Sequence, residues 1–238
     1  MKKIFITGST TGLGLLAGQM LLKQGHEVVL HARNKKSVMK ENSPYVIGDF
    51  SKPDEVKSVA EEASAHGPFD VIIHNAGVYT ASSEELFAVN VLAPYVLCCL
   101  MKQPKRMVFM SSGMHLSGTL NLDHRNCSYS DTKLFDLMLA KWFACHWPET
   151  YSNAVDPGWV PTRMGGAGAT DDLIKGAETQ VWLSVSNEPA ALVSGKYFHH
   201  LEQRISNPLA DSLKAQASLI SYLEQVSGLS VANRDLNS

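Results

Sequence analysis

Tyr129 and Lys133, four residues apart in the stretch YSDTK, are the residues of this sequence whose types and spacing most clearly suggest chemistry. Positions i and i+4 share one face of a helix. An unperturbed phenol has a pKa of about 10, which is too high for proton transfer near neutrality, and a cation held close by lowers that pKa. The pair therefore predicts a tyrosine that acts as general acid or base, with Lys133 adjusting its pKa.

A second pattern, TGSTTGLG at residues 7–14, follows the first apolar run and opens a helical one. Glycines at 8, 12 and 14 let the backbone turn tightly and approach a ligand. The free amides and the positive end of the following helix favour a pyrophosphate. An ordinary strand-to-helix turn would also explain three glycines, but the position after the first strand favours a dinucleotide.

The residue type at the end of the second strand distinguishes a site for NAD(H) from a site for NADP(H). An acidic residue there binds the ribose 2′-hydroxyl, whereas an arginine accommodates a 2′-phosphate. The sequence reads His31-Ala32-Arg33-Asn34, without a carboxylate. Because the planar guanidinium is suited to phosphate, we expect NADP(H) rather than NAD(H).

Alternating strands and helices must position these residues. Apolar runs predict strands at 3–7, 27–32, 45–49, 69–77, 106–112, 151–158 and 195–200. Helical patterns follow the glycine loop up to Gly25 and recur at 53–66, 83–100, 130–147, 171–184 and about 208–226. Strands that are apolar throughout and separated by helices imply a mostly parallel sheet covered on both faces. We therefore expect one doubly wound α/β domain over residues 1–238.

Several motifs resemble the short-chain dehydrogenase/reductase family: TGSTTGLG, HNAG (74–77), the second serine of VFMSSG, YSDTK, Asn90 in AVNVLAP, and DPGWVPT (156–162). Their order along the chain also matches, and the resemblance covers residues 2–200. It implies a Rossmann-type sheet of about seven strands and a nicotinamide cofactor. It further implies a catalytic tetrad of Asn90, Ser112, Tyr129 and Lys133, in which Ser112 hydrogen-bonds the substrate oxygen and Asn90 holds a water.

The same resemblance implies a cofactor site. Asp49 would contact adenine, residues 75–77 would line the adenosine side, and residues 157–162 would close around the nicotinamide. The full set is Gly8, Ser9, Thr10, Thr11, Gly12, Leu13, Gly14, Arg33, Asp49, Phe50, Asn75, Ala76, Gly77, Tyr129, Lys133, Pro157, Gly158, Val160 and Thr162.

Association is implied through helices 83–100 and 130–147, which gives a homodimer or homotetramer. The apolar residues Cys98, Leu139 and Trp142 of these helices could equally belong to the core.

The substrate side departs most from the family pattern. Extra length at 118–126 is expected to flank the substrate mouth, and four small residues at 165–168 suit a mobile lid or merely a long surface loop. One group of residues suggests an uncharged carbonyl or alcohol with apolar bulk: Met114, Leu116, Trp159, Val160 and Met164. Another could receive an anionic or polar substrate: His115, His124, Arg125 and Arg163. The sequence does not choose between them.

Composition excludes several other classes. A net charge of -2 gives no sign of a nucleic-acid or anionic-membrane surface. The four cysteines form no CxxC pair, the nine histidines form no metal-site pattern, and no GxSxG motif frames a serine nucleophile. The N-terminal apolar run is too short for a signal peptide, and the apolar stretch 89–101 is too short to span a bilayer. A cytoplasmic location is expected.

Together these features predict an NADP(H)-dependent oxidoreductase that interconverts a carbonyl and an alcohol, acting as a reductase in the cell on a small-molecule substrate. One alternative is a regulatory protein that senses NADP(H) without turnover, although a sensor would not need the proton-transfer residues. Another is different chemistry on a nicotinamide cofactor, such as epimerisation, for which the chain has no large substrate domain.

Overall fold

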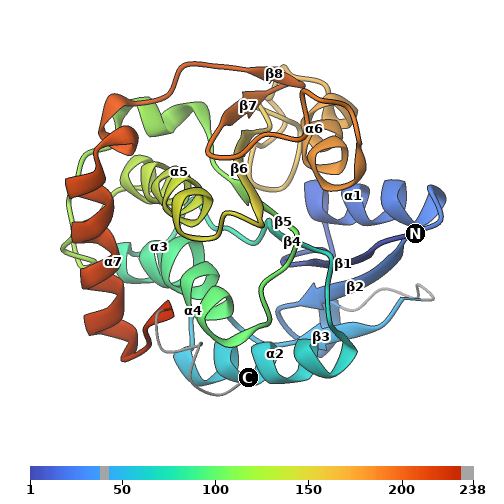
Figure 1. Ribbon diagram of the computed structural model, residues 1–238, viewed down its shortest axis with the longest axis horizontal. Coiled ribbons are helices and arrows are strands. Elements are labelled where there is room, and N and C mark those ends of the chain that lie inside the picture. The colour runs from blue at the N-terminus through green and yellow to red at the C-terminus, as the bar shows by residue number, and fades with distance from the viewer. Residues whose placement is uncertain (38–42, 232–238) are drawn as a thin grey trace.

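The computed structural model describes residues 1–37 and 43–231 and arranges them around one eight-stranded sheet (Figure 1). The strand order is β3-β2-β1-β4-β5-β6-β7-β8, parallel throughout except that β8 is antiparallel to β7. The strands are β1 Lys3–Ile6, β2 Glu27–Ala32, β3 Tyr45–Ile47, β4 Val71–His74, β5 Arg106–Met110, β6 Tyr151–Asp156, β7 Tyr197–His199 and β8 Glu202–Gln203. The predicted doubly wound α/β fold is confirmed, with one strand more than expected.

The additional strand, β8, is a two-residue strand that the sequence does not predict. It pairs with β7 across a turn formed by His200 and Leu201. Both turn residues have positive φ, 48° and 67°. Such turns usually contain Gly, Asn or Asp, so this hairpin has no turn signal in the sequence.

The order in which the chain adds strands to the sheet changes side between β1 and β4. From β1 the chain moves outward to β2 and β3, and then returns to β4 on the other side of β1. The loops that leave the carboxyl ends of β1 and β4 therefore diverge. In open α/β sheets ligands bind in the crevice at this point, and the glycine loop and the HNAG turn both leave the sheet here.

Helices cover both faces of the sheet (Figure 1). One face carries α1 and α6, and the other carries α2, the α3–α4 helix and α5. Successive side chains of β1 point to opposite faces of the sheet. Ile4 and Ile6 therefore lie in the apolar cluster under α1 and α6, and Phe5 lies in the cluster on the opposite face. All three are fully buried. The helices are α1 Gly12–Lys23, α2 Pro53–His66, α3 Ser83–Phe87, α4 Ala93–Leu100, α5 Tyr129–His146, α6 Leu173–Val185 and α7 Leu213–Ser227.

The predicted helices and strands are all present, and most boundaries agree within three residues. The largest difference concerns the closing helix, expected from about residue 208. Residues 208–211 form a separate 3-10 turn, and Ser212 then caps α7 by accepting the amide of Ala215. A serine at this position starts a new helix because its hydroxyl satisfies an otherwise unpaired amide.

Helices α3 and α4 are joined by a π-helical turn, Ala88–Leu92, into one continuous segment. The segment Ser83–Leu100 is apolar and, contrary to the expectation from the stretch 89–101, long enough to cross a membrane by length and composition alone. However, 67% of it is buried inside the protein, as is usual for a core helix.

The two helices expected to mediate association are covered by the chain itself. All residues of 93–99 in α4 and of 131–140 in α5 are buried. Helix α7 packs against α5 (Figure 1), and the Tyr95 hydroxyl donates a hydrogen bond to the Leu229 carbonyl just beyond α7. Cys98 and Leu139 are core residues on which Trp142 packs, so the core alternative for these side chains is confirmed.

Candidate active site

Tyr129 and Lys133 lie in the first turns of α5. Ser128 and Asp131 start this helix with a capping box, in which each side chain accepts the backbone amide of the other residue. Tyr129 is therefore the first helical residue, and Lys133 follows one turn later on the same face. The Lys133 Nζ lies 5.5 Å from the centroid of the Tyr129 ring, so the proximity predicted from the spacing is confirmed.

Lys133 is buried and has two partners. Its Nζ donates to the Met110 carbonyl at the end of β5, at 2.9 Å, and to the Asp136 carboxylate at 2.7 Å. The side chains of Lys133 and Asp136 are only 5% and 4% exposed. Because an ammonium has three N–H donors, these two contacts leave one donor for a further hydroxyl.

The surroundings of Tyr129 raise the pKa of its phenol above the ordinary value. Burial is the main cause, and the Asp136 and Asp156 carboxylates act in the same direction. The Lys133 charge and a hydrogen bond with Ser112 oppose them without outweighing them. Lys133 does lower the pKa of the phenol, as its spacing from Tyr129 predicts, but burial and the two carboxylates outweigh it, so the net direction is upward.

Ser111 and Ser112 follow β5 and lie beside the start of α5. The Ser112 hydroxyl accepts the amide of Met114 at 3.2 Å, and the same side chain hydrogen-bonds the Tyr129 phenol. The Ser111 hydroxyl donates to the Lys133 carbonyl at 2.7 Å, which fixes α5 to the end of β5. The structure thus brings Ser112, Tyr129 and Lys133 together.

Asn90 lies in the π-helical turn between α3 and α4, a kind of irregularity that is frequent at functional sites. Its side chain accepts the Val78 amide and donates to both the Val78 carbonyl and the Thr132 hydroxyl. Asn90 and Lys133 both approach Gly77, since the Asn90 Oδ1 and the Lys133 Nζ are 3.4 and 3.6 Å from where a Cβ on Gly77 would be. Asn90 therefore braces the site, and its role in holding a water stays a prediction.

The glycine loop leads from β1 into α1 in a conformation that suits a phosphate. Gly8 and Gly12 have φ of +61° and +57°, which residues with a Cβ adopt only with strain. Thr11 makes no side-chain cap, and the first turn of α1 has no acidic residue. Helices α3, α5, α6 and α7 each have a side-chain cap. The first amides of α1 are therefore open to an anion, and the residues present fit the pyrophosphate of a dinucleotide.

Asn75 and Ala76 hold this loop against the end of β4. The Asn75 side-chain amide donates to the carbonyls of Thr7 and Gly8, both at 3.0 Å. The backbone amides of Asn75 and Ala76 both donate to the Thr7 hydroxyl. A Cβ at Gly14 would lie 2.4 Å from the Asn75 Nδ2, so glycine at this position permits the close approach.

Some predicted cofactor-binding residues shape the loop from inside the protein. Ser9 is fully buried, and its hydroxyl donates to the Ile6 carbonyl and accepts the His31 amide. The His31 Nδ1 accepts the amide of Gly8, and its ring stacks on the buried Phe50 at 4.2 Å. Burial lowers the pKa of His31 to about 4, so the ring is neutral. Thr10 is also buried.

Arg33 and Asp49 follow β2 and β3. Arg33 is exposed and is soon followed by Lys35 and Lys36, which are exposed as well. Burial alone would raise the pKa of Asp49, but hydrogen bonds from Ser51 and the charges of Arg33 and Lys52 together hold it below its ordinary value. The loop after β2 is therefore rich in cations, and the carboxylate near Arg33 is already engaged by Ser51.

The segment after β6 approaches the glycine loop. A Cβ at Gly12 would lie 3.4 Å from the Thr162 Cγ2. Val160 and Leu13 both lie close to Gly176 of α6, and so does the Pro157 carbonyl. The predicted residues of the 157–162 segment and of the glycine loop therefore meet at the start of α1.

The 159–172 loop is closed on itself. The Trp159 amide donates to the Asp171 carboxylate at 2.6 Å, and the Asp171 amide donates to the Trp159 carbonyl at 2.9 Å. The Asp171 carboxylate also approaches Gly158 so closely that a Cβ at that position would lie 2.4 Å from it. Gly158 has a φ of +80°, which also favours glycine. The Trp159 indole donates to the Gly165 carbonyl. The lid motion expected of this loop stays a prediction.

Exposed, largely apolar side chains lie beside Tyr129. Tyr79 packs edge-on against Tyr129 with 4.8 Å between the ring centroids, and the Met164 Sδ lies 4.0 Å from the hydroxyl. Other exposed apolar side chains follow β5 and β6: Met114, Leu116 and Trp159.

The polar residues considered for the substrate side are mostly engaged elsewhere. His115 is fully buried; its Nδ1 donates to the Ser112 carbonyl, its Nε2 accepts the Asn207 amide, and burial lowers its pKa. His124 hydrogen-bonds Tyr222 of α7, and Arg125 pairs with Asp123. Arg163 is exposed. These contacts favour the apolar alternative for the substrate.

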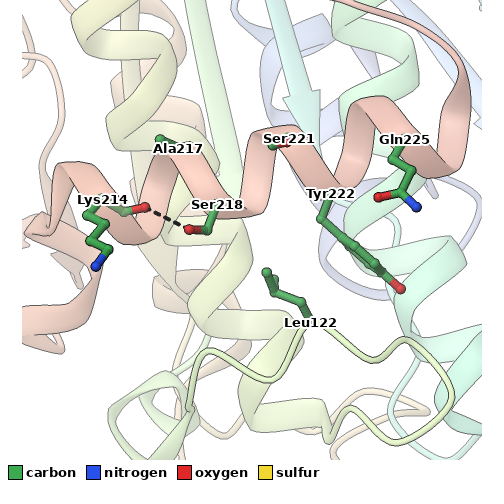
Figure 2. A pocket seen from close by; sticks show the side chains of 7 residues that line it. All are labelled: Leu122, Lys214, Ala217, Ser218, Ser221, Tyr222 and Gln225. Atoms are coloured by element: carbon green, nitrogen blue, oxygen red, sulfur yellow. Dashed lines mark hydrogen bonds between the residues drawn. The ribbon is translucent and has the colours of Figure 1, made fainter.

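A surface groove of about 510 Å³ lies beside α7, and none of the predicted catalytic residues lines it; Figure 2 shows the side chains that do. Leu122, from the 118–126 loop, faces the α7 side chains that line it: Lys214, Ala217, Ser218, Ser221, Tyr222 and Gln225. The middle of the loop expected at the substrate mouth thus packs against α7. Among residues 1–37 and 43–231, no cluster of His, Cys, Asp and Glu could hold a metal ion.

The sequence motifs miss several residues of this site. Asp136 does have a signal, since a carboxylate three residues after Lys133 interrupts the apolar run LFDLMLA. Asp156 accepts the Gly158 amide and the Tyr197 hydroxyl and acts on Tyr129 through space. The contacts of Ser111 and Tyr79 depend on tertiary packing, which no local pattern indicates.

Comparison with known proteins identifies the family. Residues 2–172 match the family model for short chain dehydrogenase. The uncharacterized oxidoreductase AN7799 of Emericella nidulans is 40% identical, over 97% of this chain and 99% of its own. The short-chain dehydrogenase chyC of Penicillium rubens is 34% identical, over 96% of this chain and 98% of its own.

A crystal structure of an uncharacterized protein from Mycobacterium paratuberculosis shares the fold, with a TM-score of 0.78 and 21% identity over 97% of this chain and 95% of that one. The motifs, the sheet order, the arrangement of Ser112, Tyr129 and Lys133, and the match over most of the sequence agree. The chain belongs to the short-chain dehydrogenase/reductase family, a family of oxidoreductases that bind nicotinamide cofactors.

Proposed function

We propose that this protein is an NADP(H)-dependent reductase that converts an uncharged, largely apolar aldehyde or ketone into the corresponding alcohol. The observation that carries the proposal is the position of Tyr129, whose ring lies 5.5 Å from the buried Lys133 ammonium and whose phenol interacts with Ser112. A phenol placed in this way can deliver a proton to a carbonyl oxygen that Ser112 also contacts.

When bound, the reduced nicotinamide supplies a hydride to the carbonyl carbon. Ser112 donates a hydrogen bond to the carbonyl oxygen and stabilises the charge that develops there. Tyr129 transfers its phenolic proton to the same oxygen, which completes the alcohol. The remaining N–H of Lys133 would hold a ribose hydroxyl, and its charge stabilises the phenolate that Tyr129 becomes.

The preference for NADP(H) rests on the exposed cations after β2. Arg33 lies where a 2′-phosphate is expected, and Lys35 and Lys36 are exposed nearby in the sequence. We expect a lower KM for NADPH than for NADH. Arg33→Ala should raise the KM for NADPH about tenfold or more, the size expected for a charge-assisted hydrogen bond, and leave that for NADH unchanged. A clear preference of the wild type for NADH would contradict the assignment.

The apolar substrate class rests on Tyr79, which packs on the Tyr129 ring, and on Met164, which lies beside the Tyr129 hydroxyl. An NADPH-oxidation screen with 4-nitrobenzaldehyde, acetophenone, menadione and 9,10-phenanthrenequinone, set against pyruvate and succinic semialdehyde, tests it. We expect turnover of the apolar carbonyls and little of the anionic ones. Tight NADPH binding without turnover of any compound would instead favour the regulatory NADP(H)-sensing alternative.

The oligomeric state is a separate proposal. Because α4 and α5 are already covered within one chain and α7 packs on α5, we propose a monomer in place of the homodimer or homotetramer expected through these helices. Cytoplasmic location remains a proposal from the sequence.

A further inference from the structure

The ion pair between Lys133 and Asp136 lies in an apolar part of α5. The two side chains are joined at 2.7 Å and are almost completely buried. The residues around Asp136 in the helix, 134–135 and 137–140, are all apolar and fully buried. Removing two charges from water carries a desolvation cost that their attraction often does not recover, so such a pair is weak evidence for stability. Its position therefore calls for another explanation.

Tyr129, Lys133 and Asp136 occupy positions i, i+4 and i+7 of α5, which lie along one face of the helix. Lys133 lies between the other two, with its Nζ near the Tyr129 ring and bonded to the Asp136 carboxylate. Its second bond is to the Met110 carbonyl of β5. Asp136 thus acts on Tyr129 both by its own charge and through the ammonium that it holds.

Groups on other helices and strands also face Tyr129 and Lys133. Asp156, at the end of β6, acts on the Tyr129 phenol, and Ser112, after β5, hydrogen-bonds it. Tyr79, after β4, packs on the Tyr129 ring, and the Asn90 Oδ1 and the Lys133 Nζ both approach Gly77. Lys133 is the cation that acts on Tyr129, and its charge is shared with Asp136.

We propose that Asp136 is a positioning residue of the catalytic site. Its carboxylate holds the Lys133 ammonium against the end of β5 and offsets part of the positive charge that would otherwise act on Tyr129. The inference rests on the proposed function, because it assumes that Tyr129 is the proton donor. The consequence is a tyrosine that keeps its proton at neutral pH, as a reductase requires of its acid. The direction of the Tyr129 pKa, above its ordinary value, agrees with this.

Asp136→Asn removes the charge and keeps the shape and one acceptor for the Lys133 Nζ. The alkaline decline of kcat for carbonyl reduction reports the loss of the phenolic proton, and without Asp136 this decline should move to lower pH. Seven residues of helix separate Asp136 from Tyr129, about 10 Å along the axis, and one charge at that distance with an effective dielectric of about 20 corresponds to about one pH unit.

The test measures kcat between pH 7 and 11 with saturating NADPH and the fastest carbonyl of the screen. Asp211→Asn is the matched control, because Asp211 pairs with Lys141 farther along the same helix. We expect the decline to shift by about one unit in Asp136→Asn and to stay in place in Asp211→Asn. Asp136→Glu, which restores the charge, should return it toward the wild-type position.

A decline that stays in place in Asp136→Asn, or that moves to higher pH, would overturn the inference. Should that variant not fold, Asp136→Ser carries the same prediction, because its smaller side chain leaves room for a water at Nζ. Failure of the proposed function is distinguishable, since the wild type would then turn over none of the carbonyls. Failure of the inference leaves the wild type active and only its pH profile insensitive to residue 136.

Discussion

Replacing Gly14 by alanine tests whether the cofactor loop is held in place by its contact with the HNAG turn. A Cβ at this position would lie 2.4 Å from the Asn75 Nδ2, 2.6 Å from the Gly8 carbonyl oxygen and 3.0 Å from the Ser9 Cα. Two of these neighbours are backbone atoms, so no side-chain rotation can relieve the contact. The loop and the turn would have to move apart.

The cost can be worked out from the contacts. Overpacking of this kind costs about 1–3 kcal/mol, and the two hydrogen bonds of the Asn75 side chain contribute about 0.5–1.5 kcal/mol each. Alanine gains about 1 kcal/mol over glycine inside a helix. The net loss is then about 3 kcal/mol, which lowers the melting temperature of a chain of this size by about 6–12 °C. Since the same loop would hold the pyrophosphate, the Kd for NADPH should rise more than tenfold.

Gly18, one turn later in α1, offers a matched control. A Cβ there would be tight only against the Leu30 Cδ2, at 3.0 Å, and that methyl group can move. Circular dichroism gives the melting temperature, and titration of NADPH fluorescence gives the Kd. Gly18→Ala should leave the Kd unchanged and should not lower the melting temperature; a rise of about 2–4 °C corresponds to the gain of about 1 kcal/mol in helix propensity. If Gly14→Ala has the melting temperature and NADPH affinity of the wild type, the loop is not held as described.

Two further predictions concern stability and assembly. Burial lowers the pKa of His31 to about 4 and that of His74 to about 3. As the pH falls, these two histidines are therefore protonated in the unfolded chain before they are protonated in the folded protein. Stability that is present above pH 6.5 is then lost toward pH 4, about 2 kcal/mol for each histidine at pH 5. Urea unfolding at pH 7 and 5 measures this, and equal stability at both values would count against it. Light scattering should give the mass of one chain, and a dimer mass would show that the covered α4 and α5 do not prevent association.

The parts of this protein that follow from the sequence are those set by local geometry. The spacing of Tyr129 and Lys133 fixes their common helix face, and the glycines of residues 7–14 fix the turn into α1. The apolar runs give the strands, because a strand in a parallel sheet is buried on both faces.

The parts that do not follow depend on partners distant in the sequence or on competition between charges. The sequence places Lys133 near Tyr129, but the balance among Asp136, Asp156 and burial decides the direction of the phenol pKa. His31 lies two residues before Arg33 in the chain, yet its ring accepts the Gly8 amide inside the protein. His124 carries no local sign that it will contact Tyr222 on α7.

The most direct test of the central claim is the activity of Tyr129→Phe, measured as NADPH oxidation with the best carbonyl of the screen, together with its affinity for NADPH. The substitution removes the hydroxyl that donates the proton and keeps the ring that packs on Tyr79. General acid catalysis contributes about 10²–10⁴-fold, so kcat should fall by at least two orders of magnitude while the Kd for NADPH stays close to that of the wild type. A variant that binds NADPH normally and keeps more than about a tenth of the wild-type kcat would contradict Tyr129 as the proton donor.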